Sequence, residues 1–472
     1  MRSLVWLLTV CCATVATLKS QRAPLQVHRP EIADCDDVAF GPDEDIYLAC
    51  HSPYDRLPID VRGAKAADEM DAYVLRLNPR TGKLVFATRF GGRSFDAALR
   101  IKVDKNGYAY TTGLTKSPDF PTTKDALQPK LAGGSDAFLV KVAPGGEIVY
   151  ATLIGGARDD LGNGLDLDER GNVYLGGVTS SSDFPAQGNN RLTTEDDAFV
   201  CWFRAVEHAI SCEIFGGRKG EKLTGIVLDR AGGIYAVGST TSPDFPVKDP
   251  VQNALAGPSD LFLTRLALPS LEMTSSTFFG GSGEDSGWGI ALDMRGNPVM
   301  AGITNSVDLP GVSASYQPRN RGKRDAFIAS IGMRHGREIR STYFGGSNDD
   351  ESGYDGGDIK VDRHGNIWLA GITYSDDLPT RNAGQPRFGS GNGDGFVAAF
   401  SADLTKLCFA SYFGNKERNL LEGLAISPAG LVAATGVSFS QAPSASHIQI
   451  GQTNLHAGAN VIVFHAETAC SR

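Results

Sequence analysis

Residues 136–185 read DAFLVKVAPGGEIVYATLIGGARDDLGNGLDLDERGNVYLGGVTSSSDFP, and this stretch decides the fold. It holds four short apolar runs, rich in Val, Ile, Leu, Tyr and Phe. The segments PGG, GGARDD, DERGN and SSSDFP separate the runs, and they consist of the residue types that tight turns require. Run length, composition and punctuation therefore predict four β-strands joined by short connections.

The same pattern recurs along the chain. The turn motif D-x-x-G, or a degenerate form of it, occurs seven times, which predicts seven units. A regular unit of about four strands is typical of a radial or linear array, because one unit cannot bury both of its faces alone. The aspartate that opens the DAF run returns every 61 to 69 residues, at Asp71, Asp136, Asp197, Asp260, Asp325 and Asp394, with Asn460 in the last copy.

The two ends of the chain fix the phase of the repeat. One strand is left over near Pro24 to Pro30, and the chain ends on VIVFHAE, the third strand of the seventh unit. We therefore expect an all-β, seven-bladed β-propeller of four-stranded antiparallel blades, in which the N-terminal strand completes the last blade. Such closure removes the two sheet edges that an open array would expose.

The units GxxVDxxGNxYxxGxTxSxDFP and DAFVxKL…YSTYLGG resemble the SBBP repeat, a seven-bladed β-propeller repeat of secreted and cell-surface bacterial proteins. The resemblance covers roughly Asp34 to Glu467. It departs in the first unit, where GPDEDIY replaces VDxxGNxY, and in the seventh, where ISPAG and QAP replace VDxxG and DFP. The resemblance implies a fold and an extracellular location, and it brings no catalytic residues with it.

Composition and the N-terminus agree with export. Residues 1–20 have a positive Arg2, an apolar stretch from Leu4 to Ala13 and small residues suited to cleavage, so they are predicted to be a signal peptide. Residues 21–472 are expected to form one domain, with no transmembrane segment and a monomeric state. The net charge of −9 argues against a nucleic-acid partner, which would need a basic footprint.

Six cysteines follow the predicted signal peptide: Cys35, Cys50, Cys201, Cys212, Cys408 and Cys470. Cys201 and Cys212 are expected to face each other across one hairpin, close to disulfide range. Cys35 follows the spare N-terminal strand and Cys470 follows the last strand, so a bond between these two is predicted to lock the ring. No mates are assigned to Cys50 and Cys408.

Acidic residues recur at the crossovers between units: Asp159, Asp160, Glu284, Asp285, Asp349 and Asp350. They are weak candidates for Ca²⁺ ligands, since calcium needs six to eight oxygens at one centre. The alternative, which we favour, is that each side chain caps its own turn. No cofactor is therefore expected.

Positions that enter the innermost strands should surround the axial channel, and their residue types differ from unit to unit. Candidate ligand contacts there are Asn163, Thr224, Trp288, Tyr354 and Glu422. No catalytic or phosphate-binding motif occurs. The sequence thus favours a secreted or cell-surface binding or scaffold module for a protein or carbohydrate. The alternative is a hydrolase or lyase with its site at the channel mouth.

Overall fold

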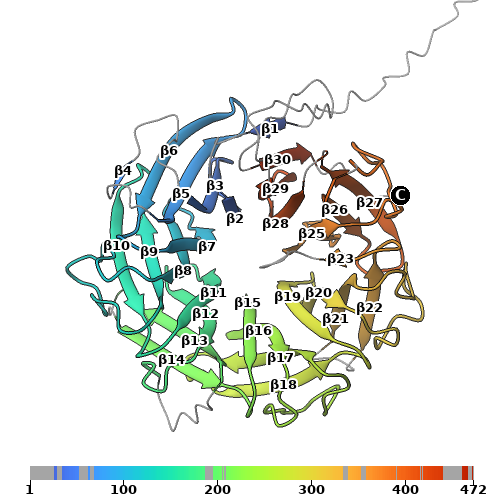
Figure 1. Cartoon of the computed structure of the whole chain (residues 1–472), viewed down its shortest axis with the longest axis horizontal. Helices are drawn as coiled ribbons and strands as arrows, with labels where there is room; N and C mark the ends of the chain where they lie inside the picture. The colour runs from blue at the N-terminus through green and yellow to red at the C-terminus, as the bar shows by residue number, and fades with distance from the viewer. Residues whose placement is uncertain are drawn as a thin grey trace, which may run out of the picture.

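The structure of the protein, a computed structural model, describes residues 26–28, 34–52, 62–63, 69–186, 195–204, 206, 209–332, 338–351, 358–389, 391–414, 416, 418–438, 460–465 and 470. Every regular element in these ranges is a β-strand, and the strands form seven sheets arranged as blades around one axis (Figure 1). The predicted seven-bladed propeller of antiparallel four-stranded blades is confirmed. The predicted signal peptide, residues 1–20, lies outside the described residues.

Each blade is named by its place in the ring, and its strands run in order from the axis outward. Blade one contains β2 (Asp34–Phe40), β3 (Ile46–Ser52), β5 (Asp71–Asn78) and β6 (Lys83–Phe90), with the two-residue β4 (Arg62–Gly63) parallel to β6. Blade two contains β7 (Asp96–Val103), β8 (Ala109–Thr115), β9 (Asp136–Val142) and β10 (Ile148–Ile154). Blade three contains β11 (Asp160–Leu167), β12 (Val173–Thr179), β13 (Asp197–Arg204) and β14 (Ala209–Phe215). Blade four contains β15 (Glu221–Asp229), β16 (Gly233–Thr240), β17 (Asp260–Ala267) and β18 (Met273–Phe279).

Blade five contains β19 (Asp285–Leu292), β20 (Pro298–Thr304), β21 (Asp325–Ile331) and β22 (Ile339–Phe344). In blade six the inner position is shared by β23 (Asp350–Glu351) and β24 (Ile359–Val361), followed by β25 (Ile367–Thr373), β26 (Asp394–Phe400) and β27 (Leu407–Phe413). Blade seven contains β28 (Asn419–Ile426), β29 (Leu431–Ser438), β30 (Asn460–His465) and β1 (Gln26–His28).

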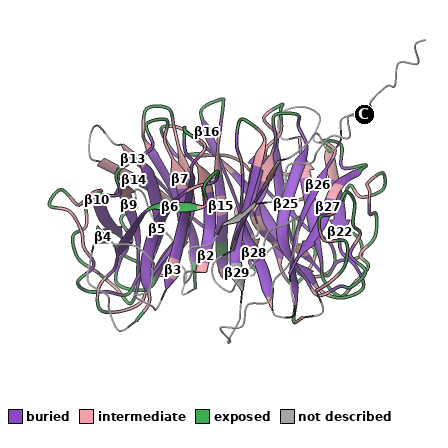
Figure 2. Cartoon of the chain, turned by 90° about the horizontal axis from the view of Figure 1, so that it is seen from above, coloured by how far each residue is buried: buried purple, intermediate pink, exposed green. Residues whose placement is uncertain are grey.

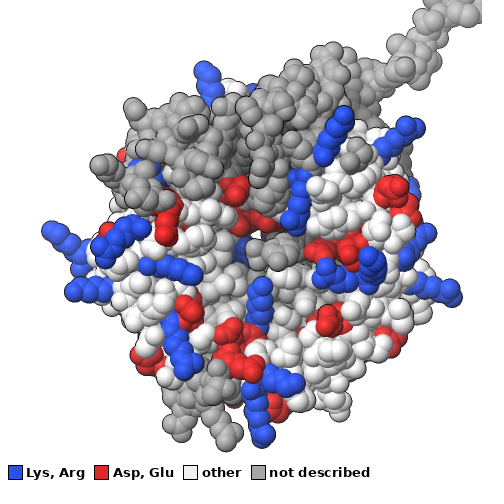
Figure 3. Space-filling model, in the orientation of Figure 1, with Lys and Arg blue, Asp and Glu red and all other residues white. Residues whose placement is uncertain are grey.

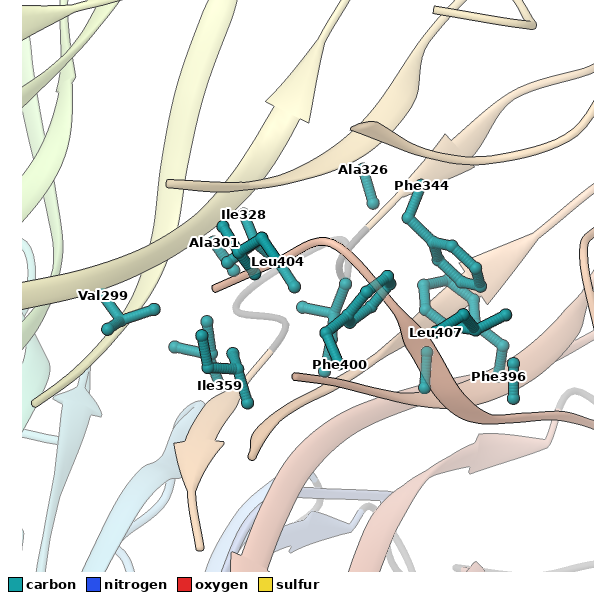
Figure 4. Close-up of a cluster of buried hydrophobic side chains, with 14 of the residues drawn as sticks. Val299, Ala301, Ala326, Ile328, Phe344, Ile359, Phe396, Phe400, Leu404 and Leu407 are labelled. Carbon is teal, nitrogen blue, oxygen red and sulfur yellow. The ribbon is translucent and has the colours of Figure 1, made fainter. Parts of the chain in front are cut away.

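The hydrophobic core lies between consecutive blades. Strand residues alternate between the two faces of a blade, so each blade contributes to two junctions. At the junction of blades five and six, Val299 and Ile328 meet Ile359, Phe396 and Phe400 (Figure 4). Seen from the side, the buried residues fill the strands and the exposed ones lie in loops on the two faces of a disc (Figure 2).

The junction of blades seven and one closes the ring by packing. Val38 and Leu48 of blade one share a buried cluster with Ala433, Val461 and Val463 of blade seven. The backbone of β1 pairs antiparallel with β30, opposite residues 461–463. That the N-terminal strand is what holds the circle closed stays a prediction, which is tested below.

The repeated motifs of the sequence meet at each blade junction. Asp136 of the DAF run accepts hydrogen bonds at Oδ2 from Gln128 Nε2 (2.6 Å) and from the amide of Ala132 (2.9 Å). Asp160, which opens the next blade, accepts at Oδ2 from the amide of Gly156 (2.7 Å) and from Ser181 Oγ (2.8 Å). The motifs therefore tie each crossover to both blades that it joins.

A bulge in the innermost strand of a blade explains why the second strand of that blade has a glycine opposite it. In blade three the pairing of β11 with β12 shifts register between Gly162 and Gly164, which adds one residue to β11. The bulge brings the carbonyl oxygen of Leu161 towards Gly177, where a Cβ would lie only 1.9 Å from it. Only glycine fits there without movement of the backbone.

Replacing Gly177 by alanine is therefore expected to destabilise the protein by about 2–3 kcal/mol, since overpacking against backbone forces a shift of the strand. Gly220→Ala is the matched control, because its added Cβ would meet nothing closer than a side-chain oxygen of Glu195 at 3.7 Å. Urea unfolding of both variants gives the comparison. Equal stabilities would contradict the close approach at the bulge.

The structure confirms one predicted disulfide and corrects the other. Cys201 and Cys212 are cross-strand partners in β13 and β14 and are bonded, with a Cα–Cα distance of 4.0 Å. Cys35 is bonded to Cys50, and Cys470 to Cys408. The predicted bond between Cys35 and Cys470 is wrong, because Cys35 lies inside the innermost strand of blade one, directly opposite Cys50 in β3.

Candidate functional site at the axial channel

The innermost strands of six blades each carry one extra residue at the same place. The pairing with the second strand shifts register there, leaving a bulge residue without a cross-strand partner. β-Bulges re-aim a side chain and often lie beside functional sites. The six bulge residues are Asp36, Leu99, Asn163, Thr224, Trp288 and Glu422.

The bulge residues surround one cavity on the axis. Asn163, Thr224, Trp288, Glu422 and Asp36 line it, as the sequence predicted for the first four. At the blade-two bulge the cavity is lined by the next residue, Arg100, and further in by Lys102, rather than by Leu99. Tyr354, the fifth predicted contact, lies outside the described residues.

Two of the predicted ligand residues also tie neighbouring blades together. Asn163 Nδ2 donates to the carbonyl oxygen of Leu223 in blade four (3.2 Å), and Thr224 Oγ1 donates to that of Gly287 in blade five (2.9 Å). Both side chains are buried. Their side-chain donors are therefore engaged in hydrogen bonds between blades.

Trp288 is the aromatic residue among the six bulge residues. Its ring is half-buried and lies under Lys222, whose Nζ is 4.8 Å from the ring centroid. The indole Nε1–H is buried and donates no hydrogen bond among the described residues. The exposed part of the ring is therefore an apolar surface with a cation beside it.

His51 and Asp36 form an ion pair that sequence reasoning missed. Asp36 Oδ2 lies 2.9 Å from His51 Nδ1, and both side chains are largely buried. Burial alone would lower the pKa of His51, but the carboxylates of Asp36, Asp34 and Glu422 outweigh it and raise that pKa to about 9. The imidazole is therefore positively charged near neutral pH. No motif spacing marks this pair, because the bulge brings it together.

Deeper in the channel, carboxylates tie successive blades. Asp37 accepts from the amide of Ile101 (2.9 Å), Asp166 from that of Leu228 (2.8 Å) and Asp358 from that of Leu424 (3.2 Å). Burial, followed by the charge of Asp358, raises the pKa of Asp37. Burial would lower the pKa of Lys102, but Asp166, Asp37 and Asp358 raise it. These charges are matched within the channel wall.

The acidic crossover residues lie away from the axis, at the blade junctions. Like Asp160, Asp285 and Asp350 are buried, and each accepts at Oδ2 from a crossover glycine amide and a serine hydroxyl. Their neighbours differ in surroundings: Asp159 accepts from Ser135 Oγ (2.9 Å), Asp349 lies 3.8 Å from Arg324 Nε, and Glu284 is exposed. No group of three or more His, Cys, Asp or Glu suited to a metal ion occurs among the described residues.

No helix in the described part of the chain is long and apolar enough to span a bilayer. The three disulfides are consistent with an oxidising, extracellular compartment.

One repeat of the chain matches a known family model. Residues 149–185 match the family model of the SBBP β-propeller repeat. The chain is 24% identical over 285 residues to the regulatory protein FlaEY of Caulobacter vibrioides, a match that covers 56% of this chain and 28% of that protein. The chain thus spans well under half of the length of this relative.

Two solved structures are similar to this chain at low sequence identity. A protein of unknown function from Dyadobacter fermentans is 10% identical, with 94% of this chain and 99% of that chain covered and a TM-score of 0.40. A PL25 ulvan lyase bound to a saccharide is 11% identical, with 86% and 92% covered and a TM-score of 0.44. The chain is a seven-bladed β-propeller, and its residues 149–185 match the SBBP β-propeller repeat.

Proposed function

We propose that the protein is a secreted or cell-surface, non-catalytic binding module whose ligand enters the axial channel. The observation that carries this proposal is the set of bulge residues. Five of the six line one cavity, and no two of these five are the same residue type. Variation confined to a shared cavity is expected where a rigid scaffold recognises a ligand.

Trp288 and Glu422 are the proposed primary contacts. Trp288 offers a half-buried aromatic ring, and Glu422 offers a carboxylate at the bulge of blade seven. Trp288 is the fourth residue of β19, so it lies near the crossover end of its strand. A polar group of a protein or a carbohydrate, entering from the crossover face, fits this pair.

An enzyme is the second candidate, because Asp36 and Glu422 line the channel and His51 pairs with Asp36. The pKa of His51, raised to about 9, works against it, since a protonated imidazole cannot accept a proton at neutral pH. The pair fits a structural ion pair between β2 and β3 better than a general base.

Two further parts of the proposal concern partners and metals. We propose a monomer that binds an extracellular protein or carbohydrate rather than nucleic acid. On the face shown in Figure 3, basic and acidic side chains of the described residues are interspersed, with no broad basic field. We also propose that no metal is needed, since the crossover carboxylates already accept protein hydrogen bonds.

Capture from glycan and surface-protein panels tests the channel site. The wild type is expected to retain a ligand that Trp288→Ala binds at least about tenfold more weakly, since aromatic anchors carry much of the binding energy at such sites. Trp288→Phe, which keeps a ring but not the N–H, is the matched variant and should bind with intermediate strength. Equal capture by wild type and Trp288→Ala would remove this residue as the contact.

A further inference from the structure

A second cavity, away from the axis, lies between blades three and four. It has a volume of about 590 Å³, within the range typical of ligand pockets. One wall is the 168–172 turn of blade three, and Tyr174 and Trp202 lie beneath that turn. Leu268 and Pro269, in the hairpin of blade four, form the opposite wall. The cavity lies at the D-x-x-G turns, so it belongs to the opposite face from the crossovers.

Other blades show what occupies this place in the repeat. In three of them, the residue aligned with Trp202 is a cation that lies over the tyrosine of the second strand. These pairs are Arg76 with Tyr47 (5.4 Å), Lys141 with Tyr110 (4.9 Å) and Arg265 with Tyr235 (5.8 Å). In blade three the tyrosine instead stacks on an indole: the Tyr174 and Trp202 rings are parallel to within 1°, with centroids 6.2 Å apart.

The cation of blade one, Arg76, connects this blade to blade two. Arg76 Nη1 donates to the carbonyl oxygen of Pro144 (3.0 Å), in the hairpin of blade two between its third and fourth strands. Arg76 Nε also donates to Asp45, in the turn of its own blade (2.9 Å). Leu268 and Pro269 stand in the corresponding hairpin of blade four. Trp202 cannot make these bonds, because an indole has one donor and no charge.

The aromatic, acidic and loop elements that receive a cation elsewhere therefore surround an open cavity here. Asp168 and Glu169 face it with two negative charges against one positive charge from Arg170. Arg204, which lies 4.8 Å from the Trp202 ring centroid, is not part of the lining and bonds to Ser211 instead. Both oxygens of Asp168 hold the turn together, so Glu169 is the carboxylate available to a guest.

We propose that this cavity is a docking site for an arginine side chain of a partner protein. The guanidinium takes the place that Arg76 and Arg265 occupy in their own blades, against the aromatic pair and beside the turn carboxylates. Arginine suits this place better than lysine, because its planar group stacks on aromatic rings and forms paired hydrogen bonds. The site is separate from the channel and does not depend on the function proposed for it.

Short peptides test the proposal on the full chain. The probe is an acetylated Gly-Arg-Gly amide, and its neutral counterpart carries citrulline in place of arginine. Binding to the wild type and to every variant is measured by isothermal titration calorimetry, and the shift of the Trp202 indole N–H resonance locates the peptide in the chains that keep this residue. The arginine peptide is expected to bind at least about tenfold more tightly than the citrulline peptide, with weaker binding at high salt. Equal binding of both peptides, or of neither, overturns the proposal.

Variants separate this site from the channel. Trp202→Arg restores the residue type of blades one and four, so the chain should fill its own cavity and bind the arginine peptide about tenfold or more weakly. Because that change alters a half-buried residue, Glu169→Gln on the exposed turn gives a second reading and should weaken binding by about threefold. Trp288→Ala should leave peptide binding unchanged. Wild-type affinity in both Trp202→Arg and Glu169→Gln contradicts the assignment.

Discussion

Lowering the pH from 8 to 5 is expected to raise the melting temperature of this protein by about 5 °C. The cause is a set of buried carboxyl groups at the blade junctions. Burial raises the pKa of three of them to about 6 and of two to about 7: Asp96, Asp136 and Asp325, then Asp350 and Asp394.

The direction of this pH effect follows from comparing the pKa of each aspartate in the folded chain with its pKa in the unfolded chain. An unfolded aspartate has a pKa near 3.9, so all five folded pKa values are raised. Each group's stabilising contribution is complete below about pH 4 and is lost as the pH rises through 6 to 7. A tenfold difference in proton affinity between the folded and unfolded states is worth ~1.4 kcal/mol for each group. The raised pKa of His51 acts in the same direction, with a loss of stability as the pH rises through about 9.

Asp394→Asn isolates one of these groups. Asp394 is fully buried, and its Oδ1 accepts no hydrogen bond among the described residues. The amide imitates the protonated acid, so the variant should melt above the wild type at pH 8 and close to it at pH 5. The exposed Asp376→Asn is the control and should change neither.

Melting curves with EDTA and with excess Ca²⁺ complete this test. Coinciding midpoints would agree with carboxyl groups that titrate without a metal. A melting temperature that stays constant or falls between pH 8 and pH 5, with Asp394→Asn no more stable at pH 8, would contradict the account of the junctions.

Removing the N-terminal segment up to residue 30 is expected to lower the free energy of unfolding by about 2–4 kcal/mol, because a few backbone hydrogen bonds between β1 and β30 are lost. The loss leaves β30 as an exposed sheet edge, which also favours association between chains. A chain that starts at residue 24 keeps β1 and is the matched control. Equal thermal stability and equal monomer content of the two forms would show that closure rests on the packing of blade one against blade seven alone.

The fold was predictable because the same turn residues recur in successive repeats. Each D-x-x-G aspartate holds its own turn: Asp168 Oδ1, for example, accepts from the amides of Arg170 and Asn172 (both 2.9 Å). The crossover glycine of blade two fits between two buried aspartates: a Cβ on Gly155 would lie 2.6 Å from Asp136 Oδ1 and 2.8 Å from Asp160 Oδ2. Because these turns and crossovers require aspartate or glycine at fixed positions, the repeat can be recognised from the sequence.

The channel was predictable in position but not in chemistry. Alignment of the repeats points to the entry of each inner strand, and there lie Asn163, Thr224, Trp288 and Glu422. Alignment cannot show that the side chains of Asn163 and Thr224 donate hydrogen bonds to neighbouring blades. The acceptors are backbone carbonyl oxygens, which leave no residue-type pattern in the sequence. Alignment also cannot show the pairing of Asp36 with His51, which depends on the bulge.

The disulfides illustrate a different limit. Cys201 and Cys212 lie in one hairpin, so their register follows from the turn. Cys35 was misplaced because blade one departs from the repeat motif, which moved this residue outside its blade. In the other bulged blades the second-strand residue beside the bulge is glycine, as in the pair of Gly162 with Gly177, whereas in blade one Cys35 faces Cys50.

Hydrogen–deuterium exchange of the intact protein tests the closed ring most directly. The backbone of residues 26–28 pairs with residues 461–463, so the amides of both segments that face each other should be protected together. The account predicts slow exchange in both segments, and faster exchange at 461–463 once the N-terminal segment is removed. Exchange of residues 26–28 at the rate of an unstructured peptide, with 461–463 unaffected by the removal, would contradict it.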